Sequence, residues 1–84
     1  MTNHFQRAVS HAVPLEKRRA AIGALAADSR ASDLAVLVRT RGLSGGLRRE
    51  AIDGLAACNA DEELAAVAAD TSLPPEIRRT AEQK

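Results

Sequence analysis

A thirty-residue repeat constrains the fold of this chain more than any other feature. The segment at 18–27 reads RRAAIGALAA, and it returns at 48–57 as RREAIDGLAA. A third copy begins as RRTA at 78–81, and no insertion or deletion disturbs the register between the copies. A fixed period of this length is typical of solenoids, in which each repeat is one supersecondary unit that packs on the next.

Apolar residues recur at helical spacing, which predicts two short α-helices in each repeat. Phe5, Ala8, Val9 and Ala12, for example, lie at positions i, i+3, i+4 and i+7 of one helix face. Proline and polar residues separate such segments from one another. The predicted helices cover residues 2–12, 15–27, 33–41, about 46–58, about 61–70 and 76–83.

Three antiparallel pairs of these helices account for the whole sequence. The predicted units are about 3–27, 33–57 and 61–83, in a single domain that spans residues 1–84. The predicted fold class is therefore all-α, an α-solenoid of three helix pairs stacked with a right-handed twist. The third copy is shorter than the others, and we expect it to act as a polar cap, which solenoids need in order to stay soluble.

Glycines and helix ends carry further expectations. Gly23 lowers helix propensity by about 1 kcal/mol relative to Ala, so we expect a neighbouring helix to approach it closely. Gly42 is predicted to end the third helix in the left-handed conformation, and residues 43–46 to form a flexible connection. The predicted N-terminal caps are Thr2 or Asn3, Ser32 or Asp33, and residues 59–61. The side chains predicted to face inward are Leu15, Arg18, Ile22, Leu25, Leu34, Leu37, Val38, Arg41, Ile52, Leu55, Leu64, Val67 and Ala68.

Composition excludes several classes of protein. The chain has 84 residues and a net charge of +1, and Phe5 is its only aromatic residue. A core built from Ala, Leu, Ile and Val, almost without aromatic side chains, favours closely packed helices over the bulkier core of a β-sandwich. Because Cys58 is the single cysteine, no internal disulfide is possible, and a reducing compartment is expected. No signal peptide and no apolar run of membrane-spanning length is visible, so we expect a cytoplasmic protein without a membrane partner.

The repeat resembles the short HEAT-like repeat of phycobilin-lyase-type HEAT proteins. The shared pattern is Arg, two residues, Ala, an apolar residue, two residues and Leu, found here at 18–25 and 48–55. The third copy follows the pattern from Pro75 to Ala81. The resemblance covers essentially the whole sequence. It implies a scaffold or adaptor, because HEAT-like units mostly serve those purposes.

The sequence predicts no catalytic, cofactor-binding or metal-binding residue, and the chain is not expected to be an enzyme. The glycine-containing segment 42–48 lacks the Lys-Ser/Thr end of a phosphate-binding P-loop. His4 and His11 have no nearby third ligand for a metal, and we expect both to be exposed. Cys58 lies at the end of a predicted helix without an adjacent His, so an inert thiol is expected.

Each repeat carries two adjacent arginines, and their predicted roles differ. The first of each pair belongs to the HEAT-like pattern, which implies that its stem packs between helices while its head bonds carboxylates or carbonyls of the neighbouring unit. The second lies outside the pattern, early in its helix, where a cation opposes the macrodipole. The six candidate partner-binding residues are therefore Arg18, Arg48 and Arg78 of the first kind and Arg19, Arg49 and Arg79 of the second.

Stacking of the repeats is expected to align the second arginines in a row, with Lys17 and Arg39 or Arg41 nearby. Such a row suits an acidic peptide, a phosphate backbone or a carboxylate-rich surface. The alternative is that the row is a solvated face held by ion pairs with Glu16, Glu50 and Glu76.

The predicted function is a scaffold or adaptor that binds a protein partner through the face of the second helices. That face carries Arg19, Gly23, Arg49, Asp53 and Arg79. An alternative is nucleic-acid or polyanion binding through the arginine row, although 11 acidic residues nearly balance 12 basic ones and aromatic side chains to stack on bases are almost lacking. Two further readings are an accessory subunit of a chromophore lyase, on resemblance alone, and a homo-oligomer formed through the open ends of the solenoid.

Overall fold

Amphipathic segments rich in Ala and Leu, separated by polar turns, give a purely helical structure. The computed structural model describes residues 4–84, and within that range it contains six α-helices and no strand. The helices are α1 (His4–Val9), α2 (Leu15–Ala27), α3 (Ala31–Arg39), α4 (Gly45–Ala57), α5 (Asp61–Ala69) and α6 (Pro75–Glu82). The all-α prediction is confirmed. In the described part of the chain, every helix is too short or too polar to cross a membrane.

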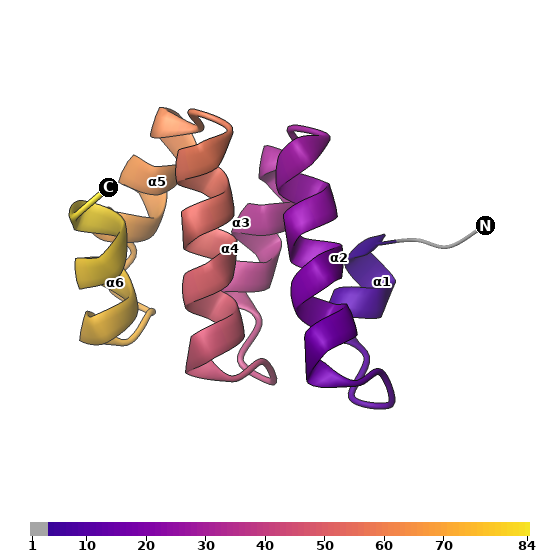
Figure 1. Ribbon diagram of the computed structural model, residues 1–84. Coiled ribbons are helices and arrows are strands. Elements are labelled where there is room, and N and C mark those ends of the chain that lie inside the picture. Colours follow the sequence, from indigo (N-terminus) through magenta and orange to yellow (C-terminus); the bar gives the residue numbers. More distant parts are fainter. Residues whose placement is uncertain (1–3) are drawn as a thin grey trace.

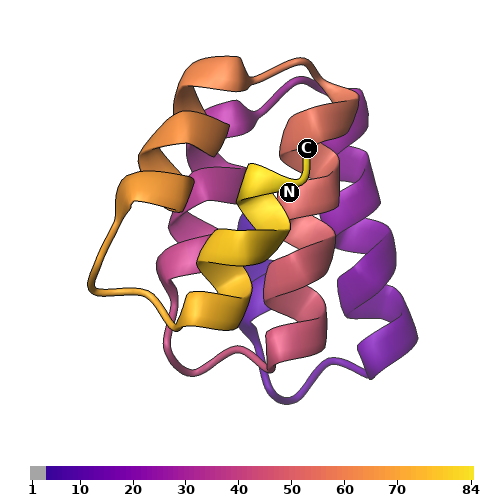
Figure 2. The same ribbon diagram turned by 90° about the vertical axis from the view of Figure 1, so that its left-hand side faces the viewer.

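The six helices lie in two layers (Figure 1). Helices α2, α4 and α6 lie side by side in one layer, with α4 in contact with both of the others. Helices α1, α3 and α5 form the second layer, which Figure 2 shows edge-on. Each helix of the second layer also packs on the helix that follows it in the chain. The molecule measures 33 × 23 × 16 Å, so side chains become buried only between the layers.

Leucine and β-branched side chains fill the space between the two layers. The largest fully buried side chains are Leu25, Leu34, Leu37, Val38, Leu47, Ile52, Leu55 and Val67. Ile22 and Leu64 are buried as well, so the predicted inward-facing set is confirmed at nine of its thirteen positions, while Arg18 and Ala68 are half-buried. It is wrong for Leu15, which is 49% exposed, and for Arg41, which is also exposed. Both residues lie at or beyond a helix end, outside the stretch that the facing layer covers.

The turns that follow α2 and α4 have the same geometry, thirty residues apart. Ser29 and Asn59 adopt the left-handed conformation, with φ of 55° and 57°. In each turn the next N–H group, that of Arg30 or Ala60, donates to a carbonyl five residues back, at 2.9 Å. This arrangement resembles a Schellman motif, which satisfies carbonyls that a helix end leaves unpaired. The sequence repeat is therefore also a repeat of backbone conformation.

The end of α3 differs from the prediction. The helix stops at Arg39 instead of Arg41, and Gly42 is not left-handed, because none of the described glycines has a positive φ. Thr40 takes an extended conformation, with ψ of 108°. Its hydroxyl donates to the Val36 carbonyl at 2.7 Å. The threonine hydroxyl satisfies that carbonyl and the extended backbone of Thr40 ends the helix, so a glycine stop is not needed.

The start of α4 also differs from the prediction, because half of the expected connection belongs to the helix. The helix begins at Gly45. Ser44 is its N-cap, and the Ser44 hydroxyl accepts from the Leu47 N–H at 3.3 Å. Leu43 is buried in the core, so the segment is anchored at both ends.

The predicted cap of α3 is wrong, whereas the N-cap of α5 lies within the predicted residues 59–61. The N-cap residues are Arg30 and Ala60, and neither makes a side-chain capping bond. Ser32 and Asp33 lie within α3, because the tight turn after α2 lets the next helix begin immediately. Thr2 and Asn3, the predicted caps of the first helix, lie outside the described residues. The first turn of α5 carries Asp61, Glu62 and Glu63, and α6 begins with Pro75.

The close approach predicted at Gly23 occurs instead at Gly54. A Cβ atom added at Gly23 meets nothing within 4 Å. At Gly54 the same atom lies 3.2 Å from Leu34 Cδ1 and 3.3 Å from Ala26 Cβ. Gly54 therefore permits α4 to contact both α2 and α3, while Gly23 leaves an open position on the surface of α2.

Candidate functional site

The first arginine of each repeat has a structural role in two of the three copies. Arg18 Nε donates to the Ala8 carbonyl at 2.9 Å, and Arg48 Nε donates to the Val38 carbonyl at 2.7 Å. Both acceptors are the next-to-last residues of a helix, α1 and α3. Helix C-termini leave carbonyls unpaired and favour cations nearby. Each arginine thus fastens the end of one helix to the start of the next.

The carbonyl that accepts this bond belongs to the preceding helix of the same pair, ten residues back. The expectation that the bond would reach a neighbouring unit is therefore wrong. Arg78 differs from the other two, because its Nε is buried without a hydrogen-bond partner. By register its acceptor would be the Ala68 carbonyl, near the end of α5. The third copy keeps the residue but not the contact.

The second arginines, Arg19, Arg49 and Arg79, are all exposed. They occupy equivalent positions of α2, α4 and α6, the three helices of one layer (Figure 1), although in the shorter α6 this position lies in the last turn. Arg19 Nε lies 3.0 Å from Glu50 Oε1 on α4, the neighbouring helix of this layer. At least one member of the row is therefore paired with a carboxylate, as the solvated-face alternative expected.

A groove runs between α2 and α4, and we call it the α2–α4 groove. Its volume is about 330 Å³. Its lining residues are Arg19, Ile22, Gly23, Ala26, Glu50, Asp53, Gly54 and Ala57. Asp53, at the edge, also pairs with Lys84. The floor is apolar and made of small residues, while ion pairs stand at the rim. Arg19, Gly23 and Asp53 were predicted on this face, and Glu50 was predicted as an ion-pair partner of the arginine row, which the Arg19–Glu50 pair confirms.

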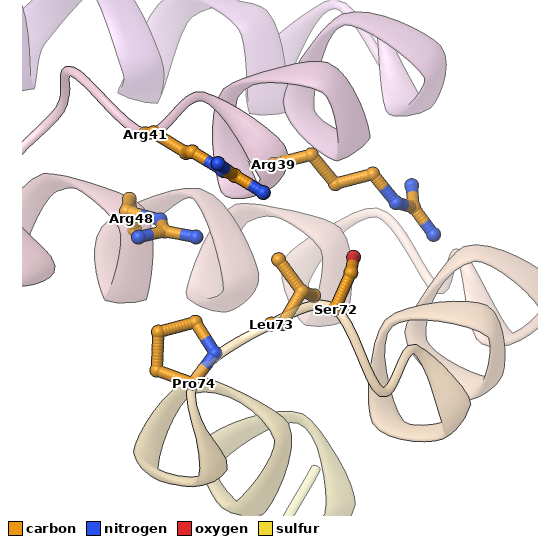
Figure 3. Close-up of a pocket in the computed structure, with 6 residues that line it drawn as sticks. All are labelled: Arg39, Arg41, Arg48, Ser72, Leu73 and Pro74. Carbon is orange, nitrogen blue, oxygen red and sulfur yellow. The ribbon is translucent and has the colours of Figure 1, made fainter.

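A second cavity lies between the α3–α4 turn and the α5–α6 turn, and we call it the arginine hollow (Figure 3). It has a volume of about 330 Å³. Its lining residues are Arg39, Arg41, Arg48, Ser72, Leu73 and Pro74. Figure 3 shows the three arginines on one side and the loop that carries the other residues facing them. Arg39 and Arg41, expected beside the row of second arginines, line this hollow together with Arg48.

The sequence carries a signal for this hollow at two positions of the middle repeat. Thirty residues before and after Arg39 the chain has Val9 and Ala69, and around Arg41 it has His11 and Thr71. Arginine at these two positions is therefore specific to the middle repeat. The signal was hidden because nothing in the sequence shows that residues 39–41 and 72–74 face each other.

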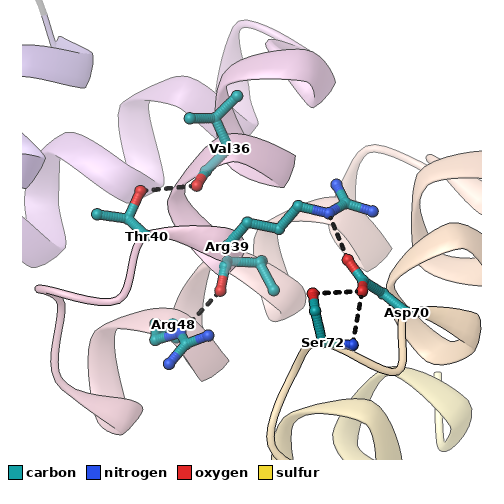
Figure 4. A network of polar contacts seen from close by, with 7 residues as sticks. Val36, Arg39, Thr40, Arg48, Asp70 and Ser72 are labelled. Carbon is teal, nitrogen blue, oxygen red and sulfur yellow. Dashed lines mark hydrogen bonds and ion pairs between the residues drawn. The ribbon is translucent and has the colours of Figure 1, made fainter.

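Asp70 organises the polar groups at the edge of the hollow (Figure 4). Its Oδ1 accepts from the Ser72 hydroxyl at 2.6 Å and from the Ser72 N–H at 3.0 Å. Its Oδ2 accepts from Arg39 Nε at 2.9 Å. The hydrogen bond from the Ser72 hydroxyl, followed by the one from Arg39, lowers the pKa of Asp70 to about 2. This carboxylate is thus ionised at neutral pH, and both of its oxygens are occupied.

The remaining candidates lie apart from these surfaces. His4 is half-buried, and its Nδ1 atom is buried without a hydrogen-bond partner, so the expectation that both histidines are exposed holds only for His11. His4 is covered because α1 packs against both α2 and α3. Cys58 is half-buried, and its thiol lies 3.6 Å from the Leu55 carbonyl. Among residues 4–84, no three His, Cys, Asp or Glu side chains are placed to share a metal ion.

Neither the known family models, nor the curated proteins, nor the solved structures include a match to this chain.

Proposed function

We propose that the chain is a small, non-enzymatic HEAT-like solenoid module that binds a protein partner. The repeated turn geometry at Ser29 and Asn59 and the repeated bonds of Arg18 and Arg48 support a solenoid of stacked helix pairs. Solenoids present extended helix faces, and such faces serve recognition of other macromolecules. The partner surface in this proposal is the layer of α2, α4 and α6.

The observation that carries the proposal is the α2–α4 groove. Its apolar floor includes Gly23, where an added Cβ atom would meet no neighbouring atom within 4 Å. Its rim holds the ion pairs of Arg19 with Glu50 and of Asp53 with Lys84. An apolar centre within a polar rim is the usual anatomy of a protein interface.

The kind of partner follows from the shape of the groove. Two neighbouring helices form its walls, and the side-chain ridge of a third helix packs into such a groove. We therefore propose an amphipathic helix of the partner, with small or medium apolar side chains at i, i+3 or i+4 and i+7. The rim charges of both signs suit polar residues of the partner helix on either side.

Charge pairing makes the polyanion alternative weaker. A phosphate backbone is bound by many unpaired cations on one face, whereas Arg19 already pairs with Glu50, and Asp53 and Glu50 add negative charge to the same face. A titration with duplex DNA tests this point. Tight binding that weakens steeply as salt rises would revive the alternative.

The main experiment fills the groove without disturbing the fold. Gly23→Gln places a side chain in open space on an exposed helix position, and Ala66→Gln makes a matched change on the exposed surface of α5. Proteins from the source cell are captured on the wild type and on both variants and then quantified. We expect at least one direct partner, confirmed with purified protein, to be lost with Gly23→Gln and retained with Ala66→Gln. A partner that binds all three equally would refute the groove as its site.

A second test addresses the arginine row. The triple change of Arg19, Arg49 and Arg79 to Glu reverses the charge of three exposed residues. We expect it to abolish partner binding, since rim charges steer association. Unchanged binding would show that the row is a solvated face.

A further inference from the structure

We propose that the arginine hollow binds a phosphate group. The hollow lies at the α3–α4 and α5–α6 turns. It shares no lining residue with the α2–α4 groove, so this inference is independent of the proposed protein-binding function.

The first support is the burial of Arg48. Among the described residues, Arg48 is the only charged residue that is buried, with 8% of its surface exposed. Its Nε donates to the Val38 carbonyl. Its two terminal nitrogens make no hydrogen bond or ion pair within residues 4–84, and they are accessible from the hollow. The buried stem thus holds an unused pair of charged donors at a fixed place, and an anion in the hollow can accept from both.

The second support is the local charge. Three guanidinium groups, those of Arg39, Arg41 and Arg48, line the hollow. Asp70 is the carboxylate that contacts this set, through Arg39, and its other oxygen is taken by Ser72. Three positive charges and one negative charge leave +2 around one cavity. A phosphate monoester, which carries a charge of about −2 at neutral pH, neutralises that excess.

The third support is the shape of the donors. Guanidinium groups present planar forks that match oxyanions in a bidentate manner. Three forks arriving from two separate segments suit a tetrahedral phosphate better than a planar carboxylate, which offers only two oxygens. Leu73 and Pro74 form an apolar wall beside the arginines. The carbon atoms of a phosphate ester can pack against this apolar wall, so we infer a phosphate monoester rather than a nucleic-acid backbone.

The fourth support comes from the repeat itself. The equivalent corner between α1 and α2 keeps the structural arginine, Arg18, but it has Val9 and His11 in place of Arg39 and Arg41. The helix pair forms there without the extra cations. The two extra cations are therefore not required by the packing of a helix pair. Arg39 also pairs with Asp70, whereas Arg41 has no ion pair among the described residues, and a ligand accounts for its place at the hollow.

The test is a titration of the full chain with inorganic phosphate, followed by NMR of backbone amides and arginine Nε–H groups. Ionic strength is held constant with chloride. We expect saturable shifts confined to residues 39–48 and 70–74. Sodium acetate serves as the carboxylate probe. A phosphoserine peptide and phenyl phosphate then distinguish a phosphorylated side chain from a small phosphate ester as the source of the group.

Three variants sharpen this titration. Arg41 is exposed and lies outside the helices. We expect Arg41→Gln to weaken phosphate binding about tenfold, which corresponds to the loss of one charge-assisted hydrogen bond. Arg49→Gln removes the same charge from an exposed site that does not line the hollow, and we expect a change of less than about twofold. Asp70→Asn removes the opposing carboxylate, and we expect binding to tighten about threefold.

The named outcomes decide the proposal. Confined shifts, loss with Arg41→Gln and gain with Asp70→Asn support a phosphate site, and circular dichroism of each variant confirms that the fold is intact. Shifts spread over all surface arginines, or equal weakening by Arg41→Gln and Arg49→Gln, overturn it. Acetate binding as tightly as phosphate overturns the assignment to phosphate.

Discussion

The corner between α1 and α2 and the corner between α3 and α4 follow the same pattern but differ in charge. In both, an arginine near the start of the second helix donates its Nε to the end of the first, from Arg18 to Ala8 and from Arg48 to Val38. In the first corner Arg18 is only half-buried, whereas Arg48 is buried and has Arg39 and Arg41 beside it. The two corners share the hydrogen bond that joins their helices, and the corner between α3 and α4 adds the cations of Arg39 and Arg41.

The largest expected effect distinguishes the two structural arginines. Arg48→Ala removes a buried stem and leaves the Val38 carbonyl unpaired, so we expect a loss of about 2–4 kcal/mol in the free energy of unfolding. Arg18→Ala makes the same change at a half-buried site, and we expect about half that loss. Urea unfolding measures both.

The exposed neighbour Arg49 is the control for that pair. Arg49→Ala is expected to change stability by less than about 0.5 kcal/mol. If Arg18→Ala proves as costly as Arg48→Ala, the difference in burial between the two corners has no energetic meaning.

The next effect concerns the glycine at the contact of α2, α3 and α4. Gly54→Ala places a Cβ atom 3.2 Å from Leu34 and 3.3 Å from Ala26, and the overpacking is expected to cost about 1–2 kcal/mol net of the gain in helix propensity. Thermal unfolding checks the value. A stabilised variant would mean that Leu34 moves aside at little cost.

Gly23, in the preceding repeat, gives the opposite expectation. Gly23→Ala meets no neighbour within 4 Å, so we expect it to stabilise the protein by about 1 kcal/mol through helix propensity alone. The same thermal experiment applies. Destabilisation would contradict the open surface at this position.

A smaller effect is expected at the two left-handed turns. Ser29→Gly relieves the steric cost of a positive φ and is expected to stabilise by about 0.5–1 kcal/mol, while Asn59→Gly gains less because Asn tolerates this conformation. Chemical unfolding of both variants tests the order. Equal gains would show that the two turns are under the same strain.

The last prediction concerns pH and the polar edge of the arginine hollow. The pKa of Asp70 is lowered from 3.8 to about 2, so the ionised form is favoured by folding. Its contribution to stability is fully present above pH 4 and is lost as the pH falls through about 2. Wild type and Asp70→Asn should therefore differ in unfolding midpoint at pH 7 and converge near pH 2. A difference that persists unchanged at low pH would contradict this role.

Much of the fold could be predicted from local patterns. The number of helices, the bounds of α2, and the buried positions Ile22, Leu25, Ile52 and Leu55 follow from apolar spacing. Such spacing is a property of neighbouring residues, so a single sequence contains it. Helix ends were less predictable, because Thr40 replaced the glycine stop expected at Gly42 through its own hydrogen bond and extended backbone.

The candidate surfaces required the tertiary structure. The sequence by itself determined that Arg18 and Arg48 are equivalent and that Arg19 and Arg49 are additional to the pattern. Only packing decided that Arg19 pairs with Glu50 and that Arg39 and Arg48 share a hollow with the loop after α5. These groups lie about thirty residues apart, and no local preference records which distant side chains meet when helices pack side by side.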